Sequence, residues 1–284
     1  MGFFSFRRAV LIGCAALLLT GAARFGVHKF LSSSRGKAMV ADRLGTAFGM
    51  PVEVSEVSVQ DGESSFGFRV MDPADPRAEV LNVPSASTDI GTADFVTGRV
   101  APSTLHVKNP ALTLRISTDG NVLTPIPSLP GTSEAFPAVV VDGARLSMRQ
   151  EGRPNFAVSG VNVKLTPNGD RIIVSGSVND PKWGSWSING EFRGDRAGWV
   201  ELVGTNAPLD RQLLETVPFL PSGAFDDMHL VGRAAVKVRL TLTATRDVQP
   251  SVEIRPTLAL FGVPLGPCFR LVPTSDGYYF APTR

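Results

Sequence analysis

Residues 236–242 read Val-Lys-Val-Arg-Leu-Thr-Leu, and this stretch decides the fold. Valine or leucine stands at every second position, with a charged or hydroxyl side chain between each pair. Because successive side chains of a β-strand point to opposite faces, the segment predicts a strand with one apolar and one solvated face. Strands of this kind are typical of antiparallel sheets.

The same alternation recurs along most of the chain after Pro51. It is visible in residues 52–59, 105–116, 139–148, 161–174, 183–202 and 252–260. Its phase changes at Ser55-Glu56, which predicts a β-bulge. Pro167-Asn168-Gly169-Asp170 separates two alternating runs and predicts a hairpin turn. At the usual spacing of hairpins, the pattern predicts about twelve strands.

These strands predict an all-β fold with a curved, mostly antiparallel sheet. A sheet with one apolar face has to cover that face. A second sheet would give a sandwich, closure on itself would give a barrel, and strong curvature would leave a groove able to hold an apolar ligand. The periodicity leaves these alternatives open, with a groove or a sandwich-like body as our prediction.

One or two short helices accompany the strands. Apolar residues recur at steps of three and four between residues 32 and 50, and Gly49 and Pro51 mark the end of that predicted amphipathic helix. It either packs over one end of the sheet or lies on a membrane surface. Residues 209–217 predict a second helix, which stops at Pro218.

The N-terminal region contains fifteen uncharged residues, 9–23, between Arg7-Arg8 and Arg24. The segment suits an uncleaved signal anchor, a cleaved signal peptide or a buried helix, and we favour the anchor. Basic residues after it outnumber those before it, which alone would place the body in the cytoplasm. We nevertheless favour export, because a short tail precedes a large β-rich body. The predicted membrane anchor includes Ala9, Val10, Leu11, Ile12, Leu17, Leu18 and Leu19.

The predicted domain organisation has five parts. Residues 1–31 form the signal anchor or signal peptide, and residues 32–50 the amphipathic helix. Residues 51–123 and 138–284 form a first and a second β region. The segment between them, 124–137, is rich in proline, serine and glycine and predicts a joint.

Composition and motifs argue against catalysis. The net charge of +2 shows no basic excess of the kind that nucleic-acid binders carry. No catalytic or nucleotide-binding motif is present, and the three histidines fit solvated positions. Cys14 and Cys268 are not expected to form a disulfide, because Cys14 lies in the apolar leader. We therefore predict no enzyme activity, no cofactor, no metal site and no nucleic-acid partner.

The order of these features resembles the AsmA-like family, relatives of the TamB-type envelope proteins. The resemblance rests on the N-terminal membrane segment, then Gly49-Met50-Pro51-Val52-Glu53-Val54, and then His106-Val107-Lys108-Asn109-Pro110-Ala111-Leu112-Thr113-Leu114 closed by Asp119-Gly120-Asn121. A second unit, residues 140–148, echoes the phrase. The resemblance covers about residues 7–171.

The resemblance implies a single-pass inner-membrane protein with its body in the periplasm. It further implies a β-groove linked to phospholipid movement and outer-membrane integrity, with the membrane, phospholipid, and other envelope proteins or further copies as partners. A structural adaptor with a filled sandwich core is the alternative. The residues predicted to face lipid in the groove are Val107, Leu112, Leu114, Val236, Val238 and Leu240.

Overall fold

The computed structural model describes residues 33–59, 62–91, 94, 102–119, 122–124, 137–193, 197–218, 231–242, 248–256, 259–260, 263–264, 268–274 and 277–283. The predicted anchor, residues 1–31, lies outside this part of the chain, as does nearly all of the predicted joint. Strands dominate the described residues, which confirms the all-β prediction.

The first half of the described chain contributes one helix and eight strands. They are α2 (Ser34–Phe48), β1 (Val52–Val59), β2 (Ser64–Asp72), β3 (Asp75–Thr88), β4 (Thr104–Lys108), β5 (Ala111–Ile116), β6 (Ala138–Gln150), β7 (Phe156–Asn168) and β8 (Arg171–Asp180).

The second half adds eight strands and a short helix. They are β9 (Gly184–Arg193), β10 (Gly198–Asp210), α4 (Arg211–Leu214), β11 (Val231–Leu242), β12 (Val248–Pro256), β13 (Ala259–Leu260), β14 (Val263–Pro264), β15 (Cys268–Thr274) and β16 (Gly277–Thr283).

Fourteen of the sixteen described strands form one sheet, whereas the sequence predicted about twelve strands in all. Its order is β1-β2-β3-β4-β6-β7-β8-β9-β10-β11-β12-β15-β16, with β5 beside β4 and paired to β3 and β6. All pairs are antiparallel except β4 with β6 and β5 with β6, which are parallel. This parallel pairing joins the two predicted β regions into a single sheet.

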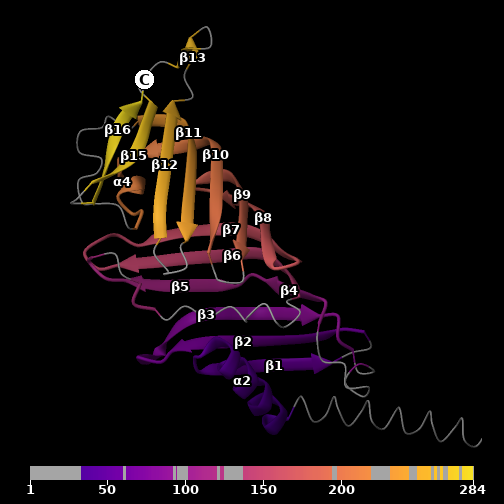
Figure 1. Ribbon diagram of the computed structural model, residues 1–284. Helices are drawn as coiled ribbons and strands as arrows, with labels where there is room; N and C mark the ends of the chain where they lie inside the picture. The colour runs from indigo at the N-terminus through magenta and orange to yellow at the C-terminus, as the bar shows by residue number, and fades with distance from the viewer. Residues whose placement is uncertain are drawn as a thin grey trace, which may run out of the picture.

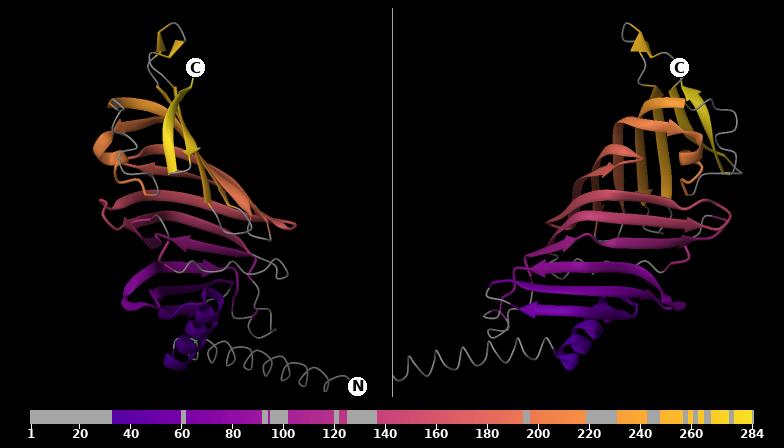
Figure 2. Two further views of the ribbon diagram at one scale, coloured as in Figure 1. Left: turned by 60° about the vertical axis from the view of Figure 1, so that its left-hand side comes forward. Right: turned by 180° about the vertical axis from the view of Figure 1, so that it is seen from behind.

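The sheet is one long, twisted layer. Strands at the β1 end run across the long axis of the molecule, whereas β9 to β12 run nearly along it (Figure 1). Two further views show α2 at one end of the layer and β15 and β16 near the other (Figure 2). A right-handed twist between neighbouring strands, summed over many strands, produces such a change of direction.

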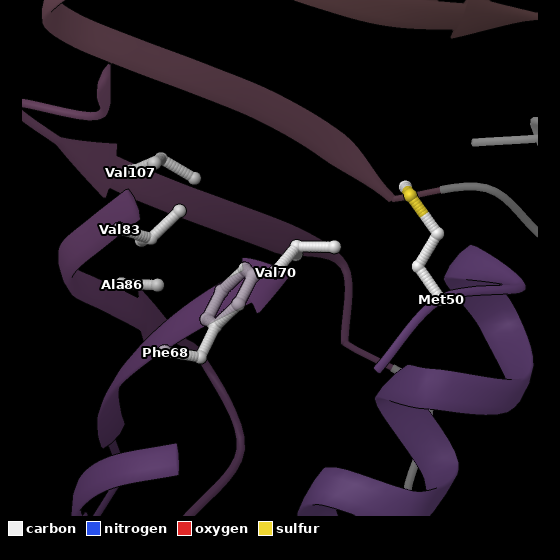
Figure 3. Close-up of a cluster of buried hydrophobic side chains, with 6 residues drawn as sticks. All are labelled: Met50, Phe68, Val70, Val83, Ala86 and Val107. Carbon is white, nitrogen blue, oxygen red and sulfur yellow. The ribbon is translucent and has the colours of Figure 1, made fainter. Parts of the chain in front are cut away.

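Helix α2 packs on the first end of the sheet, as one of the two sequence alternatives expected. The Ser33 hydroxyl accepts a hydrogen bond from the N–H of Gly36 at its start, and Gly49 ends it in the left-handed conformation. Leu44 of α2 packs against a cluster of buried side chains. Figure 3 shows this cluster, whose members are Met50, Phe68, Val70, Val83, Ala86 and Val107.

Several local predictions can be compared directly with the structure. The bulge at Ser55-Glu56 is confirmed by a register shift between Val54 and Glu56. The hairpin turn at Gly169-Asp170 is confirmed between β7 and β8. The helix predicted over 209–217 is wrong in extent, because Leu209 still pairs in β10 and the helix α4 spans only Arg211–Leu214.

Candidate functional site: an apolar sheet face

One face of the sheet carries an unbroken apolar row that crosses eleven strands. The register pairs each member with the next across β1, β2, β3, β4, β6, β7, β8, β9, β10, β11 and β12. We call these residues the central row: Val57, Phe66, Ala86, Val107, Val141, Val163, Gly176, Ile188, Leu202, Val238 and Val252. At the usual strand spacing, the row is about 50 Å long.

The row directly behind it, on the opposite face, is polar at ten of its eleven positions. Each member is the sequence neighbour of a central-row residue, so the two rows point to opposite sides of the same sheet. The members are Ser58, Ser65, Ser87, His106, Val140, Lys164, Ser175, Asn189, Glu201, Arg239 and Ser251. The sheet therefore has an apolar face and an outer face, and the contrast persists along nearly its whole length.

Further apolar rows flank the central row and widen the apolar face. One runs from β4 to β12 through Leu105, Val139, Leu165, Val174, Gly190, Val200, Leu240 and Pro250. Another crosses β10, β11, β12 and β15 through Gly204, Val236, Ile254 and Phe269. A third crosses the first strands through Val52, Val70, Leu81, Leu112, Leu146 and Val158.

The apolar face is wide as well as long. Same-face rows are two residues apart along a strand, which corresponds to about 7 Å, so three adjacent rows span about 14 Å between their centres. This width exceeds that of a single hydrocarbon chain. A linear apolar ligand could therefore lie on the face with protein side chains on both sides of it.

Burial differs between the two ends of this face. Ala86 and Val107 belong to the buried cluster beside α2. From β6 onward the central-row side chains Val141, Val163, Leu202, Val238 and Val252 are half-buried, whereas Ile188 is buried. Among the described residues, α2 contacts β1, α4 contacts β10, and no second sheet faces this surface. The described part of the face from β6 to β12 is thus apolar and partly accessible.

All six residues predicted to face lipid lie on the apolar face. Val107 and Val238 belong to the central row, at its β4 and β11 positions. Leu240 and Val236 lie in the two rows that flank it. Leu112 pairs with Leu146, and Leu114 pairs with Met148 two residues further along β5.

Trp186 stands half-buried on the apolar face. It packs against two clusters of buried side chains, one with Val174, Val178 and Ile188 and one with Ala207, Ala234, Val236 and Ile254. Gly204 lies beneath its ring, since a Cβ at Gly204 would come 2.8 Å from a ring carbon. Its indole N–H donates to the Trp183 carbonyl oxygen at 2.7 Å. The alternation of Trp186 with Ile188 was the signal that placed it on this face.

The turn between β8 and β9 fixes the rim of the face beside Trp186. The buried carboxylate of Asp180 accepts hydrogen bonds from the Ser159 hydroxyl and backbone N–H, both at 2.7 Å. It also accepts from the N–H groups of Lys182 at 2.7 Å and Trp183 at 3.0 Å. Burial alone would raise the pKa of Asp180, but these hydrogen bonds outweigh it and hold the pKa below 3.8.

Trp183 completes this rim. Its ring lies 5.2 Å from that of Phe156, measured between ring centres, and its indole N–H donates to the Ala157 carbonyl oxygen at 2.9 Å. Aromatic pairs in this geometry stabilise a fold beyond their buried area. The turn is therefore held against the start of β7 by both polar and aromatic contacts.

No group of three His, Cys, Asp or Glu side chains in the described part of the chain is placed to hold a metal ion. His106 lies exposed on the outer face, as predicted, while His28 and His229 lie outside the described residues. None of the described helices has the length and apolarity needed to cross a membrane. The residues of the predicted anchor are not among them.

Comparisons with family models, with curated proteins and with solved structures find no match for this chain. The functional argument therefore depends on the site itself. An apolar surface of this length could hold hydrocarbon, because burying each methylene away from water contributes about 0.8 kcal/mol.

Proposed function

We propose that this chain is a non-catalytic, membrane-anchored envelope protein of AsmA-like type, which shields or conveys phospholipid acyl chains along its apolar sheet face. The central row carries the proposal. An acyl chain laid over its accessible part, from β6 to β12, would meet only apolar side chains or glycine across seven strands. In the same strands the paired backbone N–H and C=O groups form hydrogen bonds with neighbouring strands. The ligand therefore does not have to form hydrogen bonds with them.

The location belongs to the same proposal. The apolar segment 9–23 would anchor the chain in the inner membrane, with the β-rich body in the periplasm and a role in outer-membrane integrity. The order of membrane segment, helix and sheet supports this assignment through the resemblance to the AsmA-like family. Helix α2 begins at Ser34, within about ten residues of the end of the segment, and packs on the β1 end of the sheet, which would place that end nearest the membrane.

The single layer of described strands favours the groove over the alternative adaptor. A filled sandwich core requires a second sheet against the apolar face. The two strands of the described chain outside the large sheet, β13 and β14, have two residues each. They are too short to bury a face of this length.

Native mass spectrometry of the full chain in mild detergent, with lipid extraction of the same sample, tests the proposal. We expect co-purifying phospholipid. Val238→Asp should reduce it at least about tenfold, because a carboxylate in the central row would be buried against hydrocarbon. Ser251→Asp places the same group on the outer face of the neighbouring strand and should leave the lipid unchanged. A folded, lipid-free wild-type protein would overturn the proposal.

A further inference from the structure

The accessible part of the apolar face is interrupted where β8 and β9 cross its middle. Val174 and Val178 of β8 are only 5% and 4% exposed, and Ile188 of β9 is 6% exposed. The central-row residues on the two sides, Val163 of β7 and Leu202 of β10, are half-buried. We call Val174, Val178 and Ile188 the packed crossing, because an apolar ligand that follows the central row has to cross them.

Two glycines allow the neighbouring strands to close in at the packed crossing. Gly176 of β8 and Gly190 of β9 both stand on the apolar face. A Cβ on Gly176 would lie 2.2 Å from the carbonyl oxygen of Asn162 in β7, and one on Gly190 would lie 2.6 Å from that of Trp199 in β10. Strand direction changes at the same place, since β7 runs across the long axis of the molecule and β9 nearly along it (Figure 1). The sheet is therefore tightly coiled here.

Side chains from three strands fill this bend. Those of β7, β9 and β10 that pack against the packed crossing are Val158, Val161, Val163, Leu165, Trp186, Phe192 and Val200. A ligand on the apolar face cannot reach Ile188 without separating these side chains. It therefore has to cross β9 over residues that are still accessible.

Trp186 is the accessible apolar-face residue of β9 nearest to the central row. Among the residues that this strand places on the apolar face, Ile188 and Gly190 are buried, whereas Trp186 and Phe192 are half-buried. Trp186 stands two residues from Ile188, and Phe192 stands four residues from it on the other side. An acyl chain that crosses β9 close to the central row would therefore contact the indole ring.

The indole ring of Trp186 is held in one position. Three of its ring carbons lie 2.8 to 2.9 Å from where a Cβ on Gly204 would be, so one face of the ring covers Gly204. The indole N–H donates to the carbonyl oxygen of Trp183 at 2.7 Å. A different rotamer would lose both contacts. The ring therefore presents its other face as a flat and rigid surface.

We propose that Trp186 determines which hydrocarbon chains the apolar face accepts, admitting unbranched acyl chains and discriminating against methyl-branched ones. An unbranched chain can lie flat on the ring and keep continuous contact with it. A methyl branch would have to displace the ring or the side chains packed beside it, and close-packed apolar groups resist such displacement. The inference rests on the proposed function and adds the class of acyl chain to it.

A competition between two phospholipids tests the inference. The full chain in mild detergent is offered equal amounts of dioleoyl and diphytanoyl phosphatidylcholine, which share a headgroup and differ in the methyl branches of their chains. Bound lipid is counted by native mass spectrometry. We expect wild type to retain the dioleoyl lipid in at least about tenfold excess, since one extra methyl group in an apolar site already changes binding by about that factor.

Trp186→Ala should lower this excess to below about threefold, because removal of the ring leaves open space above Gly204 that a methyl branch can occupy. Trp186→Leu restores part of the volume without a flat ring and should lose the preference as well, so it carries the test if the alanine variant does not fold. Trp186→Phe keeps an aromatic ring and should stay closer to wild type. The matched control Phe269→Ala removes an aromatic ring from the same face at β15 and should leave the preference unchanged.

The total amount of bound phospholipid separates this inference from the proposed function. Equal retention of the two lipids by wild type, or an unchanged preference in both Trp186→Ala and Trp186→Leu, would overturn the inference. Phospholipid would still be bound in either case, so the proposed function would stand. Absence of both lipids from wild type would overturn the proposed function and the inference together.

Discussion

At the scale of single residues, one buried carboxylate fixes the rim of the apolar face. The two carboxylate oxygens of Asp180 accept hydrogen bonds from backbone N–H groups of β7 and of the β8–β9 turn. Trp183 and Trp186 follow within six residues. Because the pKa of Asp180 is lowered in the folded state, its ionised form stabilises the protein. That contribution is present above the unfolded pKa near 3.8 and is lost as the pH falls through the lower, folded value.

Asp180→Asn should lower the free energy of unfolding by about 1–3 kcal/mol at pH 7, because an amide cannot accept all of these hydrogen bonds. Urea denaturation of the full chain in detergent measures the loss. The difference from wild type should shrink as the pH falls below about 4, since the wild-type carboxylate then becomes protonated. Asp170→Asn, at a side chain that is 81% exposed, should change stability by less than about 0.5 kcal/mol. Equal effects of the two substitutions would contradict this account.

At the scale of single elements, paired bulges keep β6 and β7 in phase. Val141 and Ala144 pair with Val163 and Val161, so β6 carries one extra residue there. Between Val161 and Val158 the extra residue lies in β7 instead. Gly143 and Gly160, both at positive φ, stand in these two bulges. Each bulge lets side chains three apart in sequence share the apolar face.

Gly160→Ala tests whether the bulge depends on close approach. Gly160 has φ +64°, and a Cβ there would lie 2.3 Å from the carbonyl oxygen of Asn179. Gly169, at φ +62° in the β7–β8 turn, has nothing within 4 Å of its would-be Cβ. Gly169→Ala should cost about 1–2 kcal/mol of unfolding free energy from its backbone conformation alone.

Gly160→Ala should cost about 1–3 kcal/mol more than that, since the neighbouring backbone has to move. Denaturation of both variants under the same conditions gives the difference. A Gly160→Ala loss no larger than that of Gly169→Ala would mean that the close approach of β7 and β8 is unimportant.

Several elements could be predicted from the sequence because their signals are local. The alternation in residues 236–242 and the hairpin at Gly169-Asp170 are encoded by neighbouring residues. The parallel pairing of β4 and β5 with β6 could not be predicted, because it depends on contacts across the joint. The break in alternation at Asp142-Gly143 does not by itself distinguish a strand end from a bulge. In the structure Gly143 has a positive φ and lies in a bulge within β6.

At the scale of the whole molecule, the alignment of apolar residues across strands matters more than any single strand. The sequence of each strand predicts which of its sides is apolar. Only the register between strands shows that Val57 and Val252 belong to one row. The choice between groove and sandwich was open for the same reason, since periodicity does not reveal what faces a sheet. The described strands form one twisted layer with its apolar side partly accessible, and the proposed function follows from that arrangement.

Tryptophan quenching tests the central claim, contact between acyl chains and the apolar face, most directly. Trp186 stands on that face, whereas Trp199 lies on the outer face with the Arg239 guanidinium 4.4 Å from its ring centre. Trp183→Phe/Trp199→Phe leaves only Trp186, and Trp183→Phe/Trp186→Phe leaves only Trp199. Each full-chain variant is titrated with phospholipid brominated on its acyl chains, with the unbrominated lipid as reference. We expect saturable quenching of Trp186 and none of Trp199, and quenching of neither residue, or equal quenching of both, would contradict the account.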